Sequence, residues 1–240
     1  MTTDNSHRIH VLTRHSLTVR LIHWSITVST FILILTGIGQ MPVYRRYMID
    51  QVPGLGWSSN FAVTLNLHYL AGIALLFAAV YHLVYHGIRR DFNIIPRRGD
   101  ARESYHIIKA ILTGCKEPPC HKYLAEQRLA YIFIAGALGI TIITGILKVI
   151  KNLPSVYFSD GFLNSITMIH NAGTFLVIFG VAAHLAAFII KENRNLLPSM
   201  FHGKVHLHYV RHRHCLWYDE LCEKGIVPAH HDNATERSQQ

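Results

Sequence analysis

Six of the eighteen histidines in this 240-residue chain lie in, or at the ends of, long stretches without charged residues. They are His23, His68, His82, His86, His170 and His184. An ionisable side chain is costly inside a membrane, so it normally faces the protein interior and has a function there. The alternative is a histidine that only bonds across helices. For any one of the six the two interpretations weigh equally, but the spacing within the set favours a function.

His170 and His184 are fourteen residues apart in one such stretch. In an α-helix this spacing spans about 21 Å along the axis and brings both imidazoles to nearly the same face. Heme iron in an electron-transfer site takes two axial ligands. The pair therefore predicts two b-type hemes at two depths, each with a second histidine from another helix. The chain has no Cys-x-x-Cys-His sequence, so covalent heme attachment is not expected.

Four apolar stretches must position these histidines or pack beside the helices that carry them. A membrane span needs about 20 apolar residues, and we expect spans near 21–40, 64–87, 129–147 and 164–190. The sequence thus predicts an all-α, integral-membrane four-helix bundle over residues 21–190. A lead at 1–20 and a basic, histidine-rich tail at 191–240 flank it, and the end of the tail, 230–240, is expected to be disordered. Between the second and third spans, 105–112 is expected to form a short surface helix that ends at Gly114.

The net charge of +9 follows the predicted topology. Nineteen of the 23 Lys and Arg residues lie before the first span, between the second and third, or after the fourth. The positive-inside rule then places both termini and the middle loop in the cytoplasm. The same charge favours contact with anionic membrane lipid, and no nucleic-acid partner is expected.

This topology assigns a depth to each histidine. The fourth helix enters from the outside, so His170 lies near the outer surface and His184 near the inner one. The second helix runs the same way, and His68, near its start, matches His170. Two candidates remain for the inner heme: His23, at the start of the first helix, and His82, fourteen residues after His68. Spacing alone leaves both open.

Small residues near these depths are expected to make room for a flat macrocycle between helices. Gly72 and Gly173 lie three or four residues after predicted ligands, and Gly37, Gly136 and Gly180 lie at middle depths. The alternative is ordinary packing of membrane helices through small residues. The glycines therefore add only weak support to the heme interpretation.

The order of motifs resembles the cytochrome b (gamma) subunits of membrane-bound formate dehydrogenases. The wider group includes diheme cytochrome b subunits of respiratory hydrogenases and thiosulfate-reductase-type enzymes. The matching residues are His23-Trp24, Thr36-Gly37, His68 with Gly72, Lys122-Tyr123, Gln127, Ile169-His170-Asn171-Ala172-Gly173, His184, Gly203-Lys204-Val205, His212-x-His214 and Trp217-Tyr218. The resemblance implies that His68 and His170 bind the outer heme, and His23 and His184 the inner one.

The resemblance also implies a function and its partners. The chain would pass electrons from an iron–sulfur electron-transfer subunit and a catalytic subunit on the periplasmic side, through two hemes b, to menaquinone or ubiquinone near the cytoplasmic face. It would be a multi-pass subunit of a bacterial or archaeal cytoplasmic (inner) membrane, with no substrate site of its own beyond quinone. A cytochrome b subunit of a hydrogenase or of a thiosulfate or sulfur-compound oxidoreductase is the alternative.

The quinone segment before the third span departs from the family pattern. Formate dehydrogenase subunits usually read Lys-Tyr-Asn-x-Gly-Gln there, whereas this chain has Leu124 and Glu126 at the Asn and Gly positions. Gln127 and Arg128 are candidates for contact with quinone or a heme propionate. Arg20 is a further candidate for either, and Glu126 for quinone contact or proton delivery.

Two further groups of histidine and cysteine residues could indicate other metal sites. The tail histidines could form a histidine box of a membrane di-iron hydroxylase or desaturase, but such sites need several boxes on separate segments. These tail histidines are His202, His206, His208, His212 and His214. Cys115 and Cys120, followed by His121, have too loose a spacing for a convincing zinc site. A basic amphipathic strip that docks a partner or lipid is the favoured interpretation of the tail.

Overall fold

The computed structural model describes residues 11–115 and 117–228, and four long helices dominate it. They are α1 (Leu17–Gly39), α3 (Phe61–Arg89), α5 (Ala125–Ile150) and α6 (Asp160–Ala186), the last extended by the 3₁₀ turn η3 (Ala187–Ile189). All four are long and apolar enough to cross a membrane. The predicted all-α fold with four spans is therefore confirmed, while the side on which the termini lie stays a prediction.

Each long helix begins three or four residues before its predicted span, and in three of them a polar cap outside the apolar run sets the start. The side chains of Ser16, Asn60 and Ser159 accept hydrogen bonds from backbone N–H groups in the first turns of α1, α3 and α6. Such caps satisfy donors that have no partner within the helix. Hydropathy locates a span, but these caps decide its first residue.

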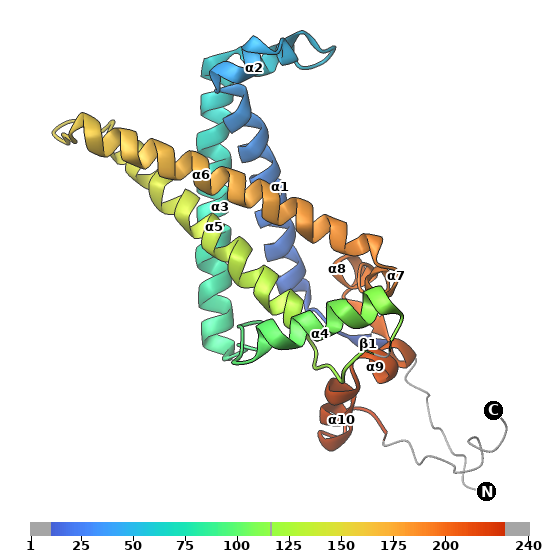
Figure 1. The fold of residues 1–240 in the computed structure, drawn as a ribbon. Helices are drawn as coiled ribbons and strands as arrows, with labels where there is room; N and C mark the ends of the chain where they lie inside the picture. The colour runs from blue at the N-terminus through green and yellow to red at the C-terminus, as the bar shows by residue number, and fades with distance from the viewer. Residues whose placement is uncertain (1–10, 116, 229–240) are drawn as a thin grey trace, which may run out of the picture.

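The long helices form two antiparallel pairs. α1 packs along α3 and α5 packs along α6, whereas contact between the pairs is limited. Figure 1 shows the α5–α6 pair crossing the α1–α3 pair at an angle. Many large apolar side chains on all four helices are exposed, as expected for surfaces that face lipid. Residues that face one another from different pairs are consequently the ones available to hold a group in the middle of the molecule.

Shorter elements connect the spans. α2 (Pro42–Arg46) and the 3₁₀ turns η1 (Ile49–Gln51) and η2 (Gly56–Ser59) join α1 to α3. α4 (Asp100–Thr113) lies between α3 and α5 and ends at Gly114, which has a φ of +67°. A positive φ favours glycine, which lacks a Cβ. The predicted surface helix over 105–112 is confirmed, and it begins five residues earlier.

The lead and the tail fold together at one end of the helices, where Figure 1 shows them beside α4. Strand β1 (Val11–Thr13) pairs antiparallel with β2 (Lys204–His206). Around them lie α7 (Lys191–Arg194), α8 (Pro198–His202), α9 (Leu207–Arg213) and α10 (Cys215–Glu223). Leu12, Val205 and Trp217 belong to one buried apolar cluster. We call residues 11–16 and 191–228 the terminal cap; the predicted disorder of 230–240 lies outside the described residues.

Candidate functional site

His68 on α3 and His170 on α6 face each other across the two helix pairs. Their ring centroids are 6.4 Å apart, with the ring planes inclined at 62°. A metal ion bound to one nitrogen of each ring, with bonds of about 2 Å, would separate the centroids by roughly 6 Å. The spacing therefore fits one metal ion held between two axial imidazoles. This depth is called the outer level below.

A threonine hydroxyl holds the other nitrogen of each ring. Thr36 Oγ1 on α1 lies 2.9 Å from His68 Nδ1 and donates to the Ile32 carbonyl at 2.7 Å. A hydroxyl has one proton, so Thr36 must accept a hydrogen bond from the Nδ1–H of His68. This arrangement leaves Nε2 of His68 unprotonated, which is the form that binds a metal.

The second ring is held in the same way. Thr144 Oγ1 on α5 lies 2.9 Å from His170 Nδ1 and donates to the Ile140 carbonyl at 2.7 Å. A glycine follows each threonine: a Cβ at Gly37 would lie 3.5 Å from His68 Cε1, and one at Gly145 3.6 Å from His170 Cε1. Thr144 and Gly145 were not among the predicted site residues, although the sequence Thr-Gly-Ile occurs at both 36–38 and 144–146.

The predicted ligands of the other depth, called the inner level, are His23 on α1 and His184 on α6; their pairing stays a prediction. His23 Nδ1 is buried and has no hydrogen-bond partner among the described residues. The His23 ring stands edge-on to Trp24, with centroids 5.5 Å apart. Buried polar atoms normally have a partner, so this nitrogen differs from the Nδ1 atoms of His68 and His170, each of which bonds a threonine hydroxyl.

The rival inner histidine has a different environment. His82 Nε2 is 3.0 Å from the hydroxyl oxygen of Tyr131 on α5. Its ring lies 4.6 Å from that of His86, and His86 Nδ1 is 3.2 Å from the Asp91 carbonyl oxygen. The nitrogen that would have to bind a metal is thus already engaged at His82.

The segment before α5 is fastened to α4 by an ion pair. Arg128 is 1% exposed, and its Nε and Nη2 donate to the two carboxylate oxygens of Asp100, each at 2.7 Å. A third bond, of 2.6 Å, joins Arg128 Nη1 to the Tyr123 carbonyl. The hydrogen bonds from Arg128 lower the pKa of Asp100 below its ordinary value. Gln127 accepts from the backbone N–H of Leu124 at the helix start.

Contact of Gln127 or Arg128 with quinone or propionate stays a prediction, since both side chains hold local structure here. Glu126 differs from them, because its Oε2 is buried without a partner among the described residues. Nearby, the ammonium of Lys122 lies 5.5 Å from the centre of the Tyr123 ring and 5.9 Å from that of Trp217. Burial lowers the pKa of Lys122.

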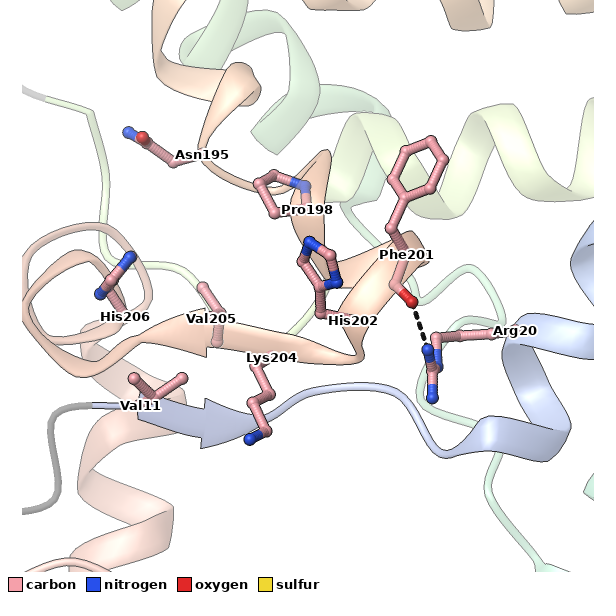
Figure 2. A pocket seen from close by; sticks show the side chains of 9 residues that line it. All are labelled: Val11, Arg20, Asn195, Pro198, Phe201, His202, Lys204, Val205 and His206. Atoms are coloured by element: carbon pink, nitrogen blue, oxygen red, sulfur yellow. Dashed lines mark hydrogen bonds between the residues drawn. The ribbon is translucent and has the colours of Figure 1, made fainter.

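Arg20 lines a cavity of about 590 Å³ beside the terminal cap. Figure 2 shows its guanidinium donating to the Phe201 carbonyl, with His202, Lys204 and His206 along the same cavity. A direct contact of Arg20 with propionate or quinone stays a prediction.

The other proposed metal sites find no support in the geometry. No group of three or more His, Cys, Asp and Glu side chains within 11–115 and 117–228 is arranged to hold a metal ion. Cys115 is exposed whereas Cys120 is buried. His214 is buried and its Nδ1 lies 2.6 Å from the His121 carbonyl oxygen, so this tail histidine fastens the terminal cap to the segment before α5.

Two of the glycines expected to make room for a macrocycle instead pack helices together. A Cβ at Gly173 would lie 2.9 Å from Thr141 Cγ2, and one at Gly180 2.9 Å from Ile134 Cγ1. Both contacts are between α6 and α5, so the expectation was wrong for these two positions. Gly72 and Gly136 do face open space.

Comparison with known proteins defines the class. Residues 14–203 match the family described as prokaryotic cytochrome b561, and the chain belongs to this family of membrane cytochromes b of electron transport. It is also similar to a formate dehydrogenase cytochrome b556 subunit from Haemophilus influenzae. The two are 24% identical over 214 residues, which cover 86% of this chain and 82% of that protein. The resemblance inferred from the motifs is thus confirmed.

Proposed function

We propose that this chain is the diheme cytochrome b subunit of a formate dehydrogenase-like complex and passes electrons from an iron–sulfur partner to quinone. The observation that carries the proposal is the His68–His170 pair. Two imidazoles from different helix pairs oppose each other at 6.4 Å, and threonine hydroxyls keep both Nε2 atoms available. Hydrogen bonding across helices alone would not explain why two rings in the metal-binding tautomer lie at this spacing.

The inner heme is assigned to His23 and His184. One observation favours His23 over His82: the Nε2 atom of His82, which would have to bind the iron, is already bonded to Tyr131. His184 repeats on α6 the fourteen-residue spacing from His170, so the two ligands of α6 lie on one face about 21 Å apart along the axis.

When bound, two hemes b supply one-electron carriers at two depths of the membrane. The chain orients the axial rings, surrounds them with apolar helices and so excludes water from the path. The charge distribution supports cytoplasmic termini and an outer level toward the periplasm. An iron–sulfur and catalytic partner on the periplasmic side and quinone on the cytoplasmic side are proposed from the similarity to formate dehydrogenase subunits.

Quinone reduction is placed beside the inner level, at the segment from Lys122 to Gln127. A quinone takes up two electrons and two protons on reduction, and the carboxyl group of Glu126, whose Oε2 is unpartnered among the described residues, is suited to pass the protons one at a time from the cytoplasmic side. The partly buried ammonium of Lys122 can donate a hydrogen bond to a quinone oxygen. Menaquinone and ubiquinone share the carbonyl chemistry that these groups recognise.

The direct test is the heme content of the purified full chain. A reduced-minus-oxidised spectrum with pyridine-hemochrome quantitation should give two hemes b per chain. Reconstitution with the partner subunits should make both hemes reducible by formate. A chain without heme would overturn the proposal. Reduction by hydrogen or a sulfur compound instead of formate would show that the chain belongs to a hydrogenase or a sulfur-compound oxidoreductase.

A further inference from the structure

Two copies of one Thr-Gly arrangement hold the imidazoles at the outer level. Thr36-Gly37 on α1 serves His68 on the neighbouring α3, and Thr144-Gly145 on α5 serves His170 on the neighbouring α6. The two oxygen-to-nitrogen distances are equal at 2.9 Å. Both threonines are buried, at 1% and 5% exposure, so water cannot readily replace either hydroxyl.

We propose that Thr36 and Thr144 are positioning residues that set the tautomer, ring plane and electron donation of the two outer axial ligands. The inference rests on the proposed outer heme. Each hydroxyl gives its only proton to a carbonyl one turn back and receives the Nδ1–H bond with a lone pair. Such a bond makes the opposite nitrogen a stronger donor to a metal and so favours the ferric over the ferrous state.

The adjacent glycines complete the arrangement. The distances of 3.5 and 3.6 Å from a Cβ to the ring Cε1 atoms correspond to ordinary van der Waals contact. The edge of each imidazole therefore lies close to the neighbouring helix backbone, which restricts rotation of the ring. The hydroxyl holds Nδ1, and the backbone at the glycine restricts the adjacent Cε1.

The test is a redox titration of both hemes in Thr36→Val and Thr144→Val. Valine keeps the branched shape but removes the acceptor. We expect the reduction equilibrium of the outer heme to shift about tenfold toward the ferrous state, or about 59 mV upward for a one-electron couple, with the inner heme unchanged. Serine at either position should restore the original potential. Thr64→Val is the matched control, because this buried hydroxyl bonds only backbone carbonyls of its own helix.

Several results would overturn the inference. An unchanged outer potential, or equal shifts of both hemes, would show that the hydroxyls do not act on the outer ligands. If the valine variant loses the outer heme but the serine variant keeps it, the positioning role is supported; loss in both excludes it. Failure of His68→Ala to remove a heme would instead contradict the proposed function, so the two failures are distinguishable.

An independent observation concerns the cavity beside the terminal cap. Arg20, His202, Lys204 and His206 line it, and none of the described residues around it is a carboxylate. Figure 2 shows these basic side chains together with Asn195 around the cavity. Arg20 Nε is buried and has no hydrogen-bond partner among the described residues. The lining thus offers fixed positive charge and at least one unused donor.

The cavity lies at the end of α1, where aromatic and apolar side chains face outward. Trp24 donates from its indole to the Met200 carbonyl at 3.1 Å and packs against Phe201, with centroids 5.1 Å apart. Leu17 and Leu21 are exposed on the same helix end. Tryptophan beside basic groups is typical of the membrane interface. We infer that the cavity binds the phosphate headgroup of an anionic phospholipid, whose acyl chains lie along α1.

Lipid binding to the full chain can be measured by native mass spectrometry in detergent with phosphatidylglycerol. Lys204→Gln should weaken binding about fivefold, the size expected for one cation at a lipid surface. Lys191→Gln, an exposed lysine of α7 outside the cavity, is the matched control and should have no effect. Phosphatidylcholine should not bind, and inorganic phosphate should not compete at equal concentration. Equal binding of phosphatidylcholine, competition by phosphate alone, or equal effects of the two lysine variants would overturn the lipid assignment.

Discussion

The two helix pairs are alike at the outer level and different at the inner one. At the outer level each pair places a threonine on its first helix against a histidine on its second, through Thr36 and His68 in one pair and Thr144 and His170 in the other. Both second helices carry another histidine fourteen residues later, His82 and His184.

The inner level breaks this equivalence. Thirteen residues before the threonine, α1 has His23 whereas α5 has Tyr131. Tyr131 bonds directly to His82, whereas His23 is the proposed partner of His184. Of two similar inner positions, one offers a second histidine and the other is closed by a tyrosine. The repeat explains why spacing alone could not separate His23 from His82.

The largest effect is expected when the outer level loses a ligand. His170→Ala should remove one of the two hemes completely and leave the other, because a heme iron without one axial ligand loses its defined site. Pyridine-hemochrome quantitation would show half the content. His208→Ala in the tail is the control. Loss of both hemes would show that the two levels do not form independently.

The second prediction concerns the two candidate ligands of the inner heme, His23 and His82. His23→Ala should also remove one heme, whereas His82→Ala should leave both. Spectra of the remaining heme should differ between His23→Ala and His170→Ala, since different hemes survive. If His82→Ala loses a heme and His23→Ala does not, the inner assignment must be reversed.

A smaller effect, on stability rather than on heme content, is expected at the start of α5, where Arg128 lies. Asp100→Asn removes the buried carboxylate that bonds Arg128 and leaves only the more distant, partly exposed Glu103 as a counter-ion; breaking a buried pair costs about 3–5 kcal/mol of unfolding free energy. Glu103→Gln is the control, because Glu103 lies 3.5 Å from Arg128 with its side chain 35% exposed and should change stability by less than about 1 kcal/mol. Equal effects in chemical unfolding would contradict the ion-pair interpretation.

The smallest effect is a pH dependence from the same carboxylate. The pKa of Asp100 is lowered in the folded chain by its bonds from Arg128. Its contribution to stability is therefore present above the unfolded pKa of about 3.9 and is lost as the pH falls through the folded value. Unfolding free energy should decline in acid for the unchanged chain, with a weaker decline in Asp100→Asn. Parallel curves would contradict this account.

The sequence by itself determined the four spans and the two depths of histidines, because apolar length and helical periodicity are local properties. Caps at Ser16, Asn60 and Ser159 shifted the helix starts, although each is a good cap former by type. The resemblance in motif order also followed from the sequence, and the family match agrees with it.

Only the tertiary structure decided what each histidine nitrogen contacts. The bonds from Thr36 and Thr144, the Tyr131–His82 contact and the Asp100–Arg128 pair join residues 26 to 49 positions apart, and neither hydropathy nor spacing reports such pairings. The pairing of residues 11–13 with 204–206 in one small sheet could not be predicted from the sequence either. Spacing along a helix fixes the depth and face of a side chain, but its partner depends on how separate helices pack.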